Sequence, residues 1–567
     1  MKLFTLLLTL LICGLITDPV IGEDYPLPKI ICYIQGTPLD STNFGDEFCW
    51  VGDQNGDGYD DLLVKHDPDE KSRPSKADRV ELFYGGNPMD DQYDRFFTLE
   101  GKNYGCARTF SYVGRLLNRR DYSVVLQNYY WQTSTKPSEY FASIYTFKPD
   151  WNESPSFIIS SQTPLKEIPA KGGHRYRPID FNGDEYDDLI LTEQVVWSDT
   201  VRTGKINVYF GSLVFDTIPG WTCIIEGMYD NFSAEISSGY DVNGDGYGDF
   251  LIQYGYKDFT SGLNSTPRFS LFLGGSEPDT IPALTWDFDS FANVEMDNGF
   301  SLLPDINGDG YDDWGVALSY GAFSDGYYIF FGSDSPDLEV DLILAGNNAS
   351  GGAVGDICGG DFNGDGYGDI VTSNSRGYHN EGEINITFGH PGLPNGKIIS
   401  SNIILNGENG DLAEFYMMGQ KVGAVGDYNG DGMDDFVFKA FVPHYYPGGV
   451  HSTPGLFILA GNREWKVDVS EDEFSQPSSL AITAYPNPIN GVVTLSIHSG
   501  QDNLGSLFIT DINGREAWKM DNLTLESGTT NLIWNTINVP AGVYIVLLQY
   551  GSGNQIKTVS QKLVVLK

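Results

Sequence analysis

A nine-residue acidic loop recurs along the 567-residue chain and restricts the folds that the chain can adopt. The clear copies are DQNGDGYDD from residue 53, DFNGDEYDD from 180, DVNGDGYGD from 241, DINGDGYDD from 305, DFNGDGYGD from 361 and DYNGDGMDD from 427. A decayed copy at residues 115–123 keeps the length and flanks of the others but loses their acids. We number these segments loops 1 to 7 in chain order. Their starts lie 56 to 66 residues apart, so each loop marks one copy of a longer repeat.

The repeats share one plan of short strands. A short strand leads into the loop, an apolar strand such as DLLV (61–64) follows it, and a third strand ends in glycine, as in VELFYGG (80–86). Several repeats add a fourth strand, for example VDLILAG (340–346). Four strands in a repeat of this length are typical of a β-propeller blade. The seven copies therefore predict an all-β fold, a seven-bladed β-propeller over residues 23–470.

The start of the repeat region predicts how the ring closes. KIICYIQG, residues 29–36, resembles a fourth strand that lacks the other three. We expect it to complete the seventh blade, whose remaining strands come from residues near 420 to 460. Closure of this kind protects edge strands that would otherwise stay unpaired.

The loops supply oxygen atoms at alternate positions, as a calcium site requires. Side chains at positions 1, 3, 5 and 9 and the carbonyl at position 7 can surround one cation; calcium accepts six to eight oxygens, whereas magnesium demands tighter geometry. The predicted ligands are Asp53, Asn55, Asp57, Tyr59 and Asp61; Asp180, Asn182, Asp184, Tyr186 and Asp188; Asp241, Asn243, Asp245, Tyr247 and Asp249; Asp305, Asn307, Asp309, Tyr311 and Asp313; Asp361, Asn363, Asp365, Tyr367 and Asp369; and Asp427, Asn429, Asp431, Met433 and Asp435. We expect about six Ca²⁺ ions, which neutralise clustered carboxylates and fix the hairpins.

An EF-hand is excluded because position 12 lies in an apolar strand and carries no carboxylate, as at Val64 and Phe438. Two loops depart from the pattern. Glu185 replaces the turn glycine of loop 3, so that site should be strained or weaker. Loop 2 places Arg115, Leu117, Arg119 and Ser123 at the ligand positions and is predicted to be metal-free, with guanidinium groups replacing the charge of the cation.

The six matching loops resemble those of the FG-GAP repeats in the integrin α-chain propeller, over about residues 29–469. The resemblance implies that each loop joins the first two strands of a blade and that the opposite face binds ligands. Segments after the second strands are rich in aromatic residues: Tyr129, Tyr130, Trp131, Trp197, Tyr254, Tyr256, Tyr320, Tyr378, His379, Tyr445 and Tyr446. Such rings suit stacking on sugars or anchoring a protein partner, although they could instead pack against one another.

Charge and motifs limit the function. The formal net charge of -43 argues against nucleic acid and anionic lipid as partners. The sequence has no H-E-x-x-H, G-x-S-x-G or phosphate-binding loop, so we expect a non-catalytic protein that binds extracellular glycan or protein. The alternatives are a calcium-dependent polysaccharide lyase, with Arg376 or Lys257 assisting proton abstraction, and a structural surface component.

The N-terminus predicts export. Residues 1–22 combine Lys2 with an apolar run at 3–16 and a small residue, Gly22, at the expected cleavage site. No other segment is apolar enough to span a membrane, so the mature chain should have no transmembrane span. Five cysteines remain, at 32, 49, 106, 223 and 358, and a bridge between Cys32 and Cys49 stays open.

After the repeats, residues 471–479 form an acidic, polar linker and residues 480–567 a separate unit with alternating strands, expected to be a small β-sandwich. YPNP at 485–488, DINGREAW at 511–518 and PAGVYIVLL at 540–548 resemble the C-terminal sorting domain of the type IX secretion system. The resemblance implies contact with that secretion machinery and a location at the cell surface or outside the cell. An ordinary adhesion sandwich is the alternative.

Overall fold

The computed structural model describes residues 26–36, 44–66, 79–98, 104–130, 139–147, 154–160, 173–196, 202–226, 235–256, 266–287, 299–318, 326–345, 355–374, 382–391, 393, 397–399, 401–406, 417–446, 449–465, 481–485, 492–499, 503–511, 515–525, 528–536, 539–540, 542–550 and 557–565. Over these ranges the fold is all-β, with one short 3-10 segment, η2 (Gly173–Arg175). The chain divides into two compact units, Met1–Lys466 and Val467–Lys567. The predicted signal peptide at 1–22 and the linker at 471–479 lie outside the described residues.

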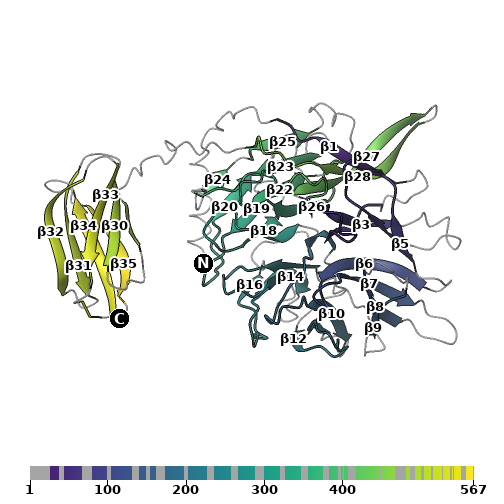
Figure 1. The fold of residues 1–567 in the computed structure, drawn as a ribbon, viewed down its shortest axis with the longest axis horizontal. Helices are drawn as coiled ribbons and strands as arrows, with labels where there is room; N and C mark the ends of the chain where they lie inside the picture. Colours follow the sequence, from purple (N-terminus) through teal and green to yellow (C-terminus); the bar gives the residue numbers. More distant parts are fainter. Residues whose placement is uncertain are drawn as a thin grey trace. The chain divides into compact units, whose positions relative to one another are not determined.

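The described part of the first unit contains seven sheets, numbered here with their loops (Figure 1). Sheet 1 is β2 (Phe48–Gly52), β3 (Asp61–His66), β4 (Arg79–Phe83) and β5 (Arg95–Thr98). Sheet 2 is β6 (Tyr104–Gly114), β7 (Ser123–Tyr130), β8 (Glu139–Thr146) and β9 (Phe157–Ser160). Sheet 3 is β10 (Leu189–Val196), β11 (Arg202–Tyr209) and β12 (Trp221–Glu226). Sheet 4 is β13 (Glu235–Tyr240), β14 (Asp249–Tyr256), β15 (Thr266–Phe272) and β16 (Leu284–Asp287).

Sheets 5 to 7 follow the same plan with two additions. Sheet 5 is β17 (Phe300–Leu303), β18 (Asp313–Leu318), β19 (Gly326–Phe330), β20 (Leu342–Ala345) and β24 (Lys397–Ile399). Sheet 6 is β21 (Ile357–Gly360), β22 (Asp369–Asn374), β23 (Glu383–Thr387) and β25 (Ile403–Asn406). Sheet 7 is β26 (Val422–Gly426), β27 (Asp435–Tyr446), β28 (Gly449–Leu459) and β1 (Ile30–Gln35). The additions are β24, which pairs in parallel with β20, and β1, which comes from the start of the chain.

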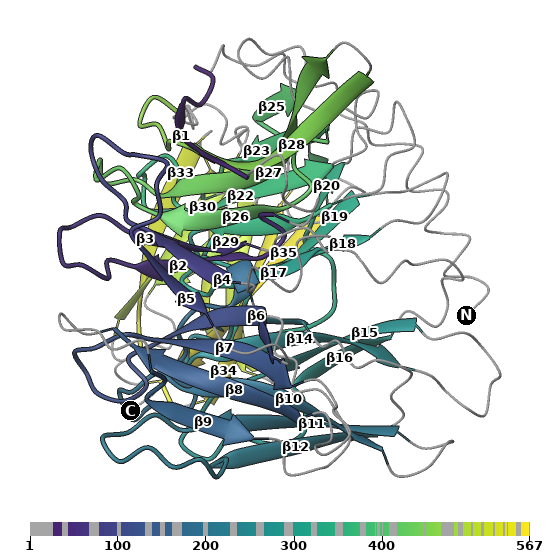
Figure 2. The ribbon, with the colours of Figure 1, turned by 90° about the vertical axis from the view of Figure 1, so that its right-hand side faces the viewer.

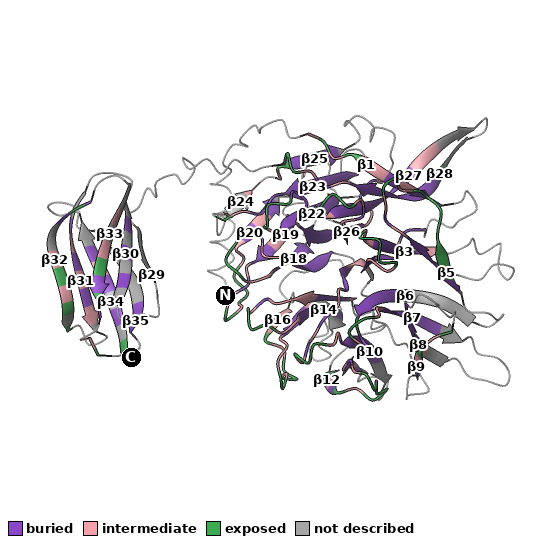
Figure 3. Cartoon of the chain, viewed as in Figure 1, coloured by how far each residue is buried: buried purple, intermediate pink, exposed green. Residues whose placement is uncertain are grey.

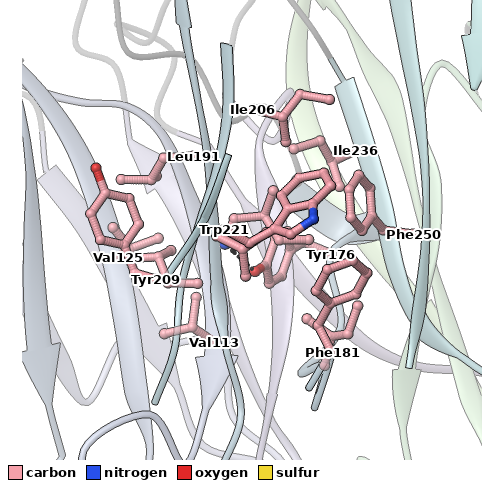
Figure 4. Close-up of a cluster of buried hydrophobic side chains, with 14 of the residues drawn as sticks. Val113, Val125, Tyr176, Phe181, Leu191, Ile206, Tyr209, Trp221, Ile236 and Phe250 are labelled. Atoms are coloured by element: carbon pink, nitrogen blue, oxygen red, sulfur yellow. Dashed lines mark hydrogen bonds between the residues drawn. The ribbon is translucent and has the colours of Figure 1, made fainter. Parts of the chain in front are cut away.

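The second strands of sheets 5 and 6 are buried on both faces because each sheet packs between two neighbours. Every described side chain of β18 and β22 is buried, instead of the alternation that a half-exposed strand has (Figure 3). Figure 4 shows one of the resulting cores, in which Val125 of sheet 2, Trp221 of sheet 3 and Phe250 of sheet 4 come together. The Trp221 ring lies 5.4 Å from that of Phe181 and 5.6 Å from that of Phe272. Such aromatic contacts add to the burial energy that holds adjacent sheets together.

The seven sheets follow one another in a closed cycle of contacts (Figure 2). Their first strands meet in the order β2, β6, η2, β13, β17, β21, β26 and back to β2. In sheet 3 the segment η2 stands where the other sheets have an inner strand, and it contacts β2, β6, β13 and β26.

The same backbone hydrogen bond recurs at six of the seven joints between neighbouring sheets. The residue after the glycine that ends the third strand donates its N–H to the position-2 carbonyl of the preceding loop, at 2.9 to 3.1 Å. The donors and acceptors are Gly86 to Tyr428, Ser212 to Leu116, Gly275 to Phe181, Ser333 to Val242, His390 to Ile306 and Asn462 to Phe362. The first of these bonds joins sheet 1 to sheet 7, so the two ends of the repeat region meet in the same way as five of the six other pairs of neighbouring sheets.

The strand expected at residues 29–36 does complete sheet 7. β1 pairs antiparallel with β28, with Ile34 opposite Leu456 and Tyr33 opposite Phe457, and the last two rings stack at 4.4 Å. The Trp465 indole N–H donates to the Pro26 carbonyl at 2.6 Å. Cys32 and Cys49 are both buried free thiols, so the bridge that the sequence left open is not formed.

The second unit has two sheets around one core. The first is β29 (Ala481–Tyr485), β30 (Val492–Ser499) and β33 (Gly528–Asn535). The second is β32 (Glu516–Leu525), β31 (Asn503–Asp511), β34 (Gly542–Tyr550) and β35 (Lys557–Val565). Leu495 from the first sheet and Leu507 and Val546 from the second are fully buried in the same cluster. In the described parts of the chain, no helix has the length and apolar character needed to cross a membrane.

Candidate functional site

The acidic loops gather at one end of the cycle of sheets. In sheets 1 and 4 to 7 the loop joins the innermost strand to the second strand, and position 9 is the first residue of that second strand. Because the inner strands lead into their loops in the same sense, all of these loops emerge at the same end. Loop 3 joins η2 to β10 in the equivalent place.

Each acidic loop is closed by its own side chains. In loop 5, Asp305 Oδ1 accepts the N–H of Gly308 at 2.6 Å and Asp305 Oδ2 accepts that of Gly310 at 2.8 Å. Asn307 Oδ1 accepts the N–H of Asp309 at 2.9 Å, and Asp309 Oδ1 accepts that of Tyr311 at 3.0 Å. The other acidic loops repeat most of these bonds. The oxygens at positions 1, 3 and 5 are therefore held in place by the backbone. Asp305 Oδ1 also accepts the N–H of Asp309 at 3.2 Å, which engages both of its lone pairs, whereas Asp305 Oδ2, Asn307 Oδ1 and Asp309 Oδ1 each retain a further lone pair.

The aspartate at position 9 is fully buried in all six loops. In loop 5, Asp313 Oδ2 accepts the N–H of Ile306 at 2.8 Å and Asp313 Oδ1 accepts that of Gly332 at 2.8 Å. The second donor is the glycine that ends the third strand, and each of the six repeats with an acidic loop keeps a glycine there: a Cβ on Gly332 would lie 2.1 Å from the Asp312 carbonyl oxygen. Position 9 thus ties the loop to the sheet.

Ionisation of these buried carboxylates is opposed by their surroundings. The pKa of Asp313 is raised to about 8, mainly by burial and also by the charges of Asp309 and Asp305, although the two backbone N–H bonds lower it. The pKa of Asp61 is likewise raised to about 8, mainly by burial. A divalent cation among these oxygens would remove the repulsion.

The carboxylate, amide and carbonyl oxygens of the loops suit a hard cation. In this structure the position-5 carboxylate is hydrogen-bonded to an asparagine amide group instead. The N–H of the position-3 asparagine donates to the position-5 carboxylate in loops 1, 3, 4, 5 and 6, at 2.8 to 3.1 Å. Within the described residues, no three acidic, histidine or cysteine side chains are already arranged around a metal position. A cation would replace the amide donor at position 5 and recruit the asparagine oxygen instead.

The side chain at position 7 has a role that the sequence analysis missed. It lies against the position-4 glycine of the preceding loop. A Cβ on Gly183 would lie 2.3 Å from the Tyr247 ring, and one on Gly430 would lie 2.4 Å from the Tyr59 ring. The second contact joins loop 1 to loop 7. The sequence does contain a pattern that indicates this contact, because position 7 is a large residue, Tyr or Met, in every acidic loop.

Loop 2 is closed differently. Asn118 Oδ1 accepts the N–H groups of Arg120 and Asp121, both at 2.8 Å. The Arg119 guanidinium reaches out to loop 3, where it lies 2.5 Å from Glu185 and donates to the Asp184 carbonyl at 3.3 Å. The hypothesis that guanidinium groups replace the charge of a cation in loop 2 is therefore wrong for Arg119, because its charge pairs with Glu185 of loop 3.

Glu185 has the strained backbone that the sequence predicts. Its φ is 69°, in the left-handed region that disfavours side chains. The equivalent glycines, such as Gly246 and Gly310, have φ of 87° and 92°. Loop 3 is thus the one acidic loop in which a side chain occupies this turn.

The aromatic residues predicted to bind a ligand fall mostly outside the described side chains. Tyr129 and Tyr130 end β7, Tyr256 ends β14, and Tyr445 and Tyr446 end β27, so their backbones lie at the end of the sheets opposite the loops. Outside the described residues are Trp131, Trp197, Tyr320, Tyr378, His379, Arg376 and Lys257. The prediction is wrong for Tyr254, which is 4% exposed and shares a hydrogen bond with Ser270 at 3.1 Å.

A buried ionic cluster lies where the inner strands begin, at the end opposite the loops. The Arg175 guanidinium pairs with both Glu235 and Asp356, and His174 Nε2 lies 2.7 Å from Asp356 Oδ2. Although burial opposes it, the charge of Arg175 holds the pKa of Asp356 well below its ordinary value, and burial lowers the pKa of His174. Lys421 Nζ lies 3.9 Å from Asp356. The cluster joins sheets 3, 4, 6 and 7.

Two family models match the chain. The secretion system C-terminal sorting domain matches residues 483–565, and the FG-GAP repeat matches residues 353–384, which include loop 6. A search of curated proteins gives no match. The sorting domain indicates that the chain is exported to the cell surface or the medium and that it interacts with the secretion machinery.

Three of the solved structures that match are distant in sequence from this chain. PorZ, a surface component of the type IX secretion system of Porphyromonas gingivalis, is 11% identical over 92% of this chain and 81% of its own, with a TM-score of 0.24. A copper-bound fungal alcohol oxidase is 10% identical over 96% and 98%, with a TM-score of 0.24. A glycoside hydrolase family 32 protein from Bifidobacterium adolescentis is 9% identical over 88% and 84%, with a TM-score of 0.25.

At these TM-scores the likenesses carry no argument about this chain. The two family models match segments whose motifs resemble the same two families, namely the acidic loop at 361–369 and the C-terminal unit. This chain carries an FG-GAP repeat and, after it, a type IX secretion system C-terminal sorting domain.

Proposed function

We propose that the chain is a secreted, calcium-stabilised, seven-bladed β-propeller that binds extracellular glycan or protein without catalysing a reaction. The seven sheets would be the blades, and the closed cycle of their inner strands supports this arrangement. The sorting domain would deliver the propeller to the outside, where it remains on the surface or is released.

Calcium binding rests on the donor set of the loops. Asp, Asn and carbonyl oxygens are the ligands that calcium prefers, and millimolar affinity would suffice outside the cell. In loop 5 the ion would be held by Asp305, Asn307, Asp309, the Tyr311 carbonyl and Asp313. Bound calcium would supply positive charge to carboxylates whose present partners are backbone and amide N–H groups.

The length and position of the β27–β28 hairpin are the main support for the proposed ligand-binding face. Its strands have 12 and 11 residues and stay paired as far as Tyr446 and Gly449. The hairpin extends beyond the neighbouring strands in Figure 1. Since β27 starts at loop 7, its far end lies opposite the calcium loops, and the sequence there is His444, Tyr445, Tyr446. A projecting aromatic tip of this kind suits contact with a sugar or a protein surface.

The test is retention of the secreted chain on immobilised polysaccharides and matrix proteins, with calcium or with a chelator. We expect calcium-dependent retention on at least one surface, reduced at least tenfold by a Tyr445→Ala, Tyr446→Ala variant. The matched control is Tyr93→Ala, Phe96→Ala, which removes two rings, one just before β5 and one within it, that are 41% and 42% exposed.

Two results would contradict the proposal. Retention that is unchanged in the hairpin variant would place the ligand elsewhere. Release of soluble fragments from a retained polysaccharide would favour the calcium-dependent lyase instead.

A further inference from the structure

Position 8 is either aspartate or glycine in the six acidic loops. It is aspartate in loops 1, 3, 5 and 7, at Asp60, Asp187, Asp312 and Asp434. It is glycine in loops 4 and 6, at Gly248 and Gly368. None of these residues is a predicted ligand, so the calcium pattern does not explain the choice.

Each position-8 aspartate contacts the first ligand position of the preceding loop. Asp60 Oδ2 accepts the N–H of Asp427 at 2.9 Å, and Asp434 Oδ2 accepts that of Asp361 at 2.9 Å. Asp187 Oδ2 accepts the N–H of Arg115 at 2.5 Å, at the joint with loop 2. Asp434 and Asp361 are 73 positions apart in the sequence, and Asp60 and Asp427, whose bond closes the ring, are 367 positions apart.

Asp312 contacts two first ligands at once. Its Oδ2 accepts the N–H of Asp241 in loop 4 at 2.9 Å, and its Oδ1 accepts the N–H of Asp305 in its own loop at 3.0 Å. Burial raises the pKa of Asp312, and the charges of Asp241 and Asp305 raise it as well. One carboxylate therefore positions the starting residues of loops 4 and 5.

The space at these joints is matched to position 8. A Cβ on Gly426, the residue before loop 7, would lie 2.0 Å from Asp60 Oδ2, and one on Gly360 would lie 2.9 Å from Asp434 Oδ2. Where the preceding loop begins after Ile179 or Pro304, position 8 is glycine instead, and a Cβ there would lie 2.7 Å or 2.4 Å from those side chains. At each of these four joints a glycine on one side faces a larger side chain on the other; the joint of loops 4 and 5 differs, because Tyr240 precedes loop 4 and position 8 is Asp312.

We propose that the position-8 aspartates are positioning residues that couple calcium binding in neighbouring loops. The inference rests on the proposed function. Asp312 couples loops 4 and 5, Asp434 couples loops 6 and 7, and Asp60 couples loops 7 and 1. The joints from loop 3 to loop 4 and from loop 5 to loop 6 lack this coupling. Carboxylates behind the ligands of a metal commonly change its affinity by about 10- to 100-fold when they are removed.

The test is a calorimetric calcium titration of the full chain and of an Asp312→Asn variant. We expect two of six sites to weaken by about 10- to 100-fold in the variant, with the other four unchanged. The control is Asp337→Asn, which changes an exposed aspartate of the same sheet whose side chain accepts the Glu339 N–H. That control should keep all six affinities.

A stability measurement separates coupling from a purely structural bond. Asp312→Asn should lower the urea midpoint of unfolding more in calcium than in chelator, because part of its effect acts through the ions. Equal losses in both conditions, or six unchanged affinities, would overturn the inference while leaving calcium binding intact. A parent chain that binds no calcium would overturn the proposed function as well.

Discussion

Glu185 holds a main-chain conformation that the other five acidic loops give to glycine. A side chain in the left-handed region costs about 1 to 2 kcal/mol. Its ion pair with Arg119 is exposed on both sides, and such pairs contribute about 0 to 1 kcal/mol. We therefore expect Glu185→Gly to raise the free energy of unfolding by about 1 kcal/mol, measured by urea denaturation.

The matched control is Gly246→Ala, at φ 87° in loop 4 with open space around the new Cβ. It should lose about 1 to 2 kcal/mol. A Glu185→Gly variant that is less stable than the parent would mean that the contact with Arg119 outweighs the strain.

Gly426 shows how tightly loops 7 and 1 join. At φ 68°, a Cβ there would meet Asp60 Oδ2 at 2.0 Å and Trp50 Nε1 at 2.5 Å. Left-handed strain and overpacking together should make Gly426→Ala less stable by about 2 to 5 kcal/mol in thermal or urea unfolding. Gly56→Ala, at φ 79° with nothing within 4 Å, should cost only about 1 to 2 kcal/mol. Equal losses in the two variants would contradict the close joint.

At this scale the sequence predicts the oxygen donors and the strain at Glu185 because both follow from residue type and spacing. It does not predict the contacts of Tyr247 with Gly183 or of Asp312 with Asp241, because these join loops that are about 60 residues apart. The prediction for Arg119 is wrong for the same reason. Its charge pairs with Glu185 of the next loop, which no local pattern indicates.

Among the elements, β1 determines whether the cycle of sheets closes. Ile34 is 1% exposed and packs with Leu456 and other residues of sheets 1 and 7. Ile34→Ala should destabilise the whole first unit by about 2 to 5 kcal/mol, shifting one cooperative transition in urea. Ile281→Ala, at 72% exposed, should change stability by less than about 0.5 kcal/mol. A parent-like transition with only local loss of β1 would contradict closure by this strand.

The elements themselves are largely predictable, since the recurring loops fix where each first and second strand meets. Two elements are not. β24 is three residues long and adds to the sheet of the preceding repeat, a non-local pairing. In sheet 3 the expected inner strand is replaced by η2, where the sequence GHRYRP carries charged residues and a proline that do not suit a buried strand.

Over the whole first unit, the ionic cluster around Asp356 joins four sheets. Removing one partner of a buried ion pair costs about 3 to 5 kcal/mol, because the remaining charge is left unpaired. We expect Asp356→Asn to lose about that much stability at pH 7, where Asp356 is ionised in the parent. Asp337→Asn is the exposed control and should lose less than about 0.5 kcal/mol. A loss below about 1 kcal/mol for Asp356→Asn would show that the cluster does not hold the sheets together.

We propose that six loops at one end of the ring each bind one calcium ion. Calorimetric titration of the chelator-treated protein measures the number of ions bound per chain. We expect six ions, with loop 2 empty. Seven ions would contradict the assignment of loop 2, and a folded chain that binds no calcium would show that the loops are not calcium sites.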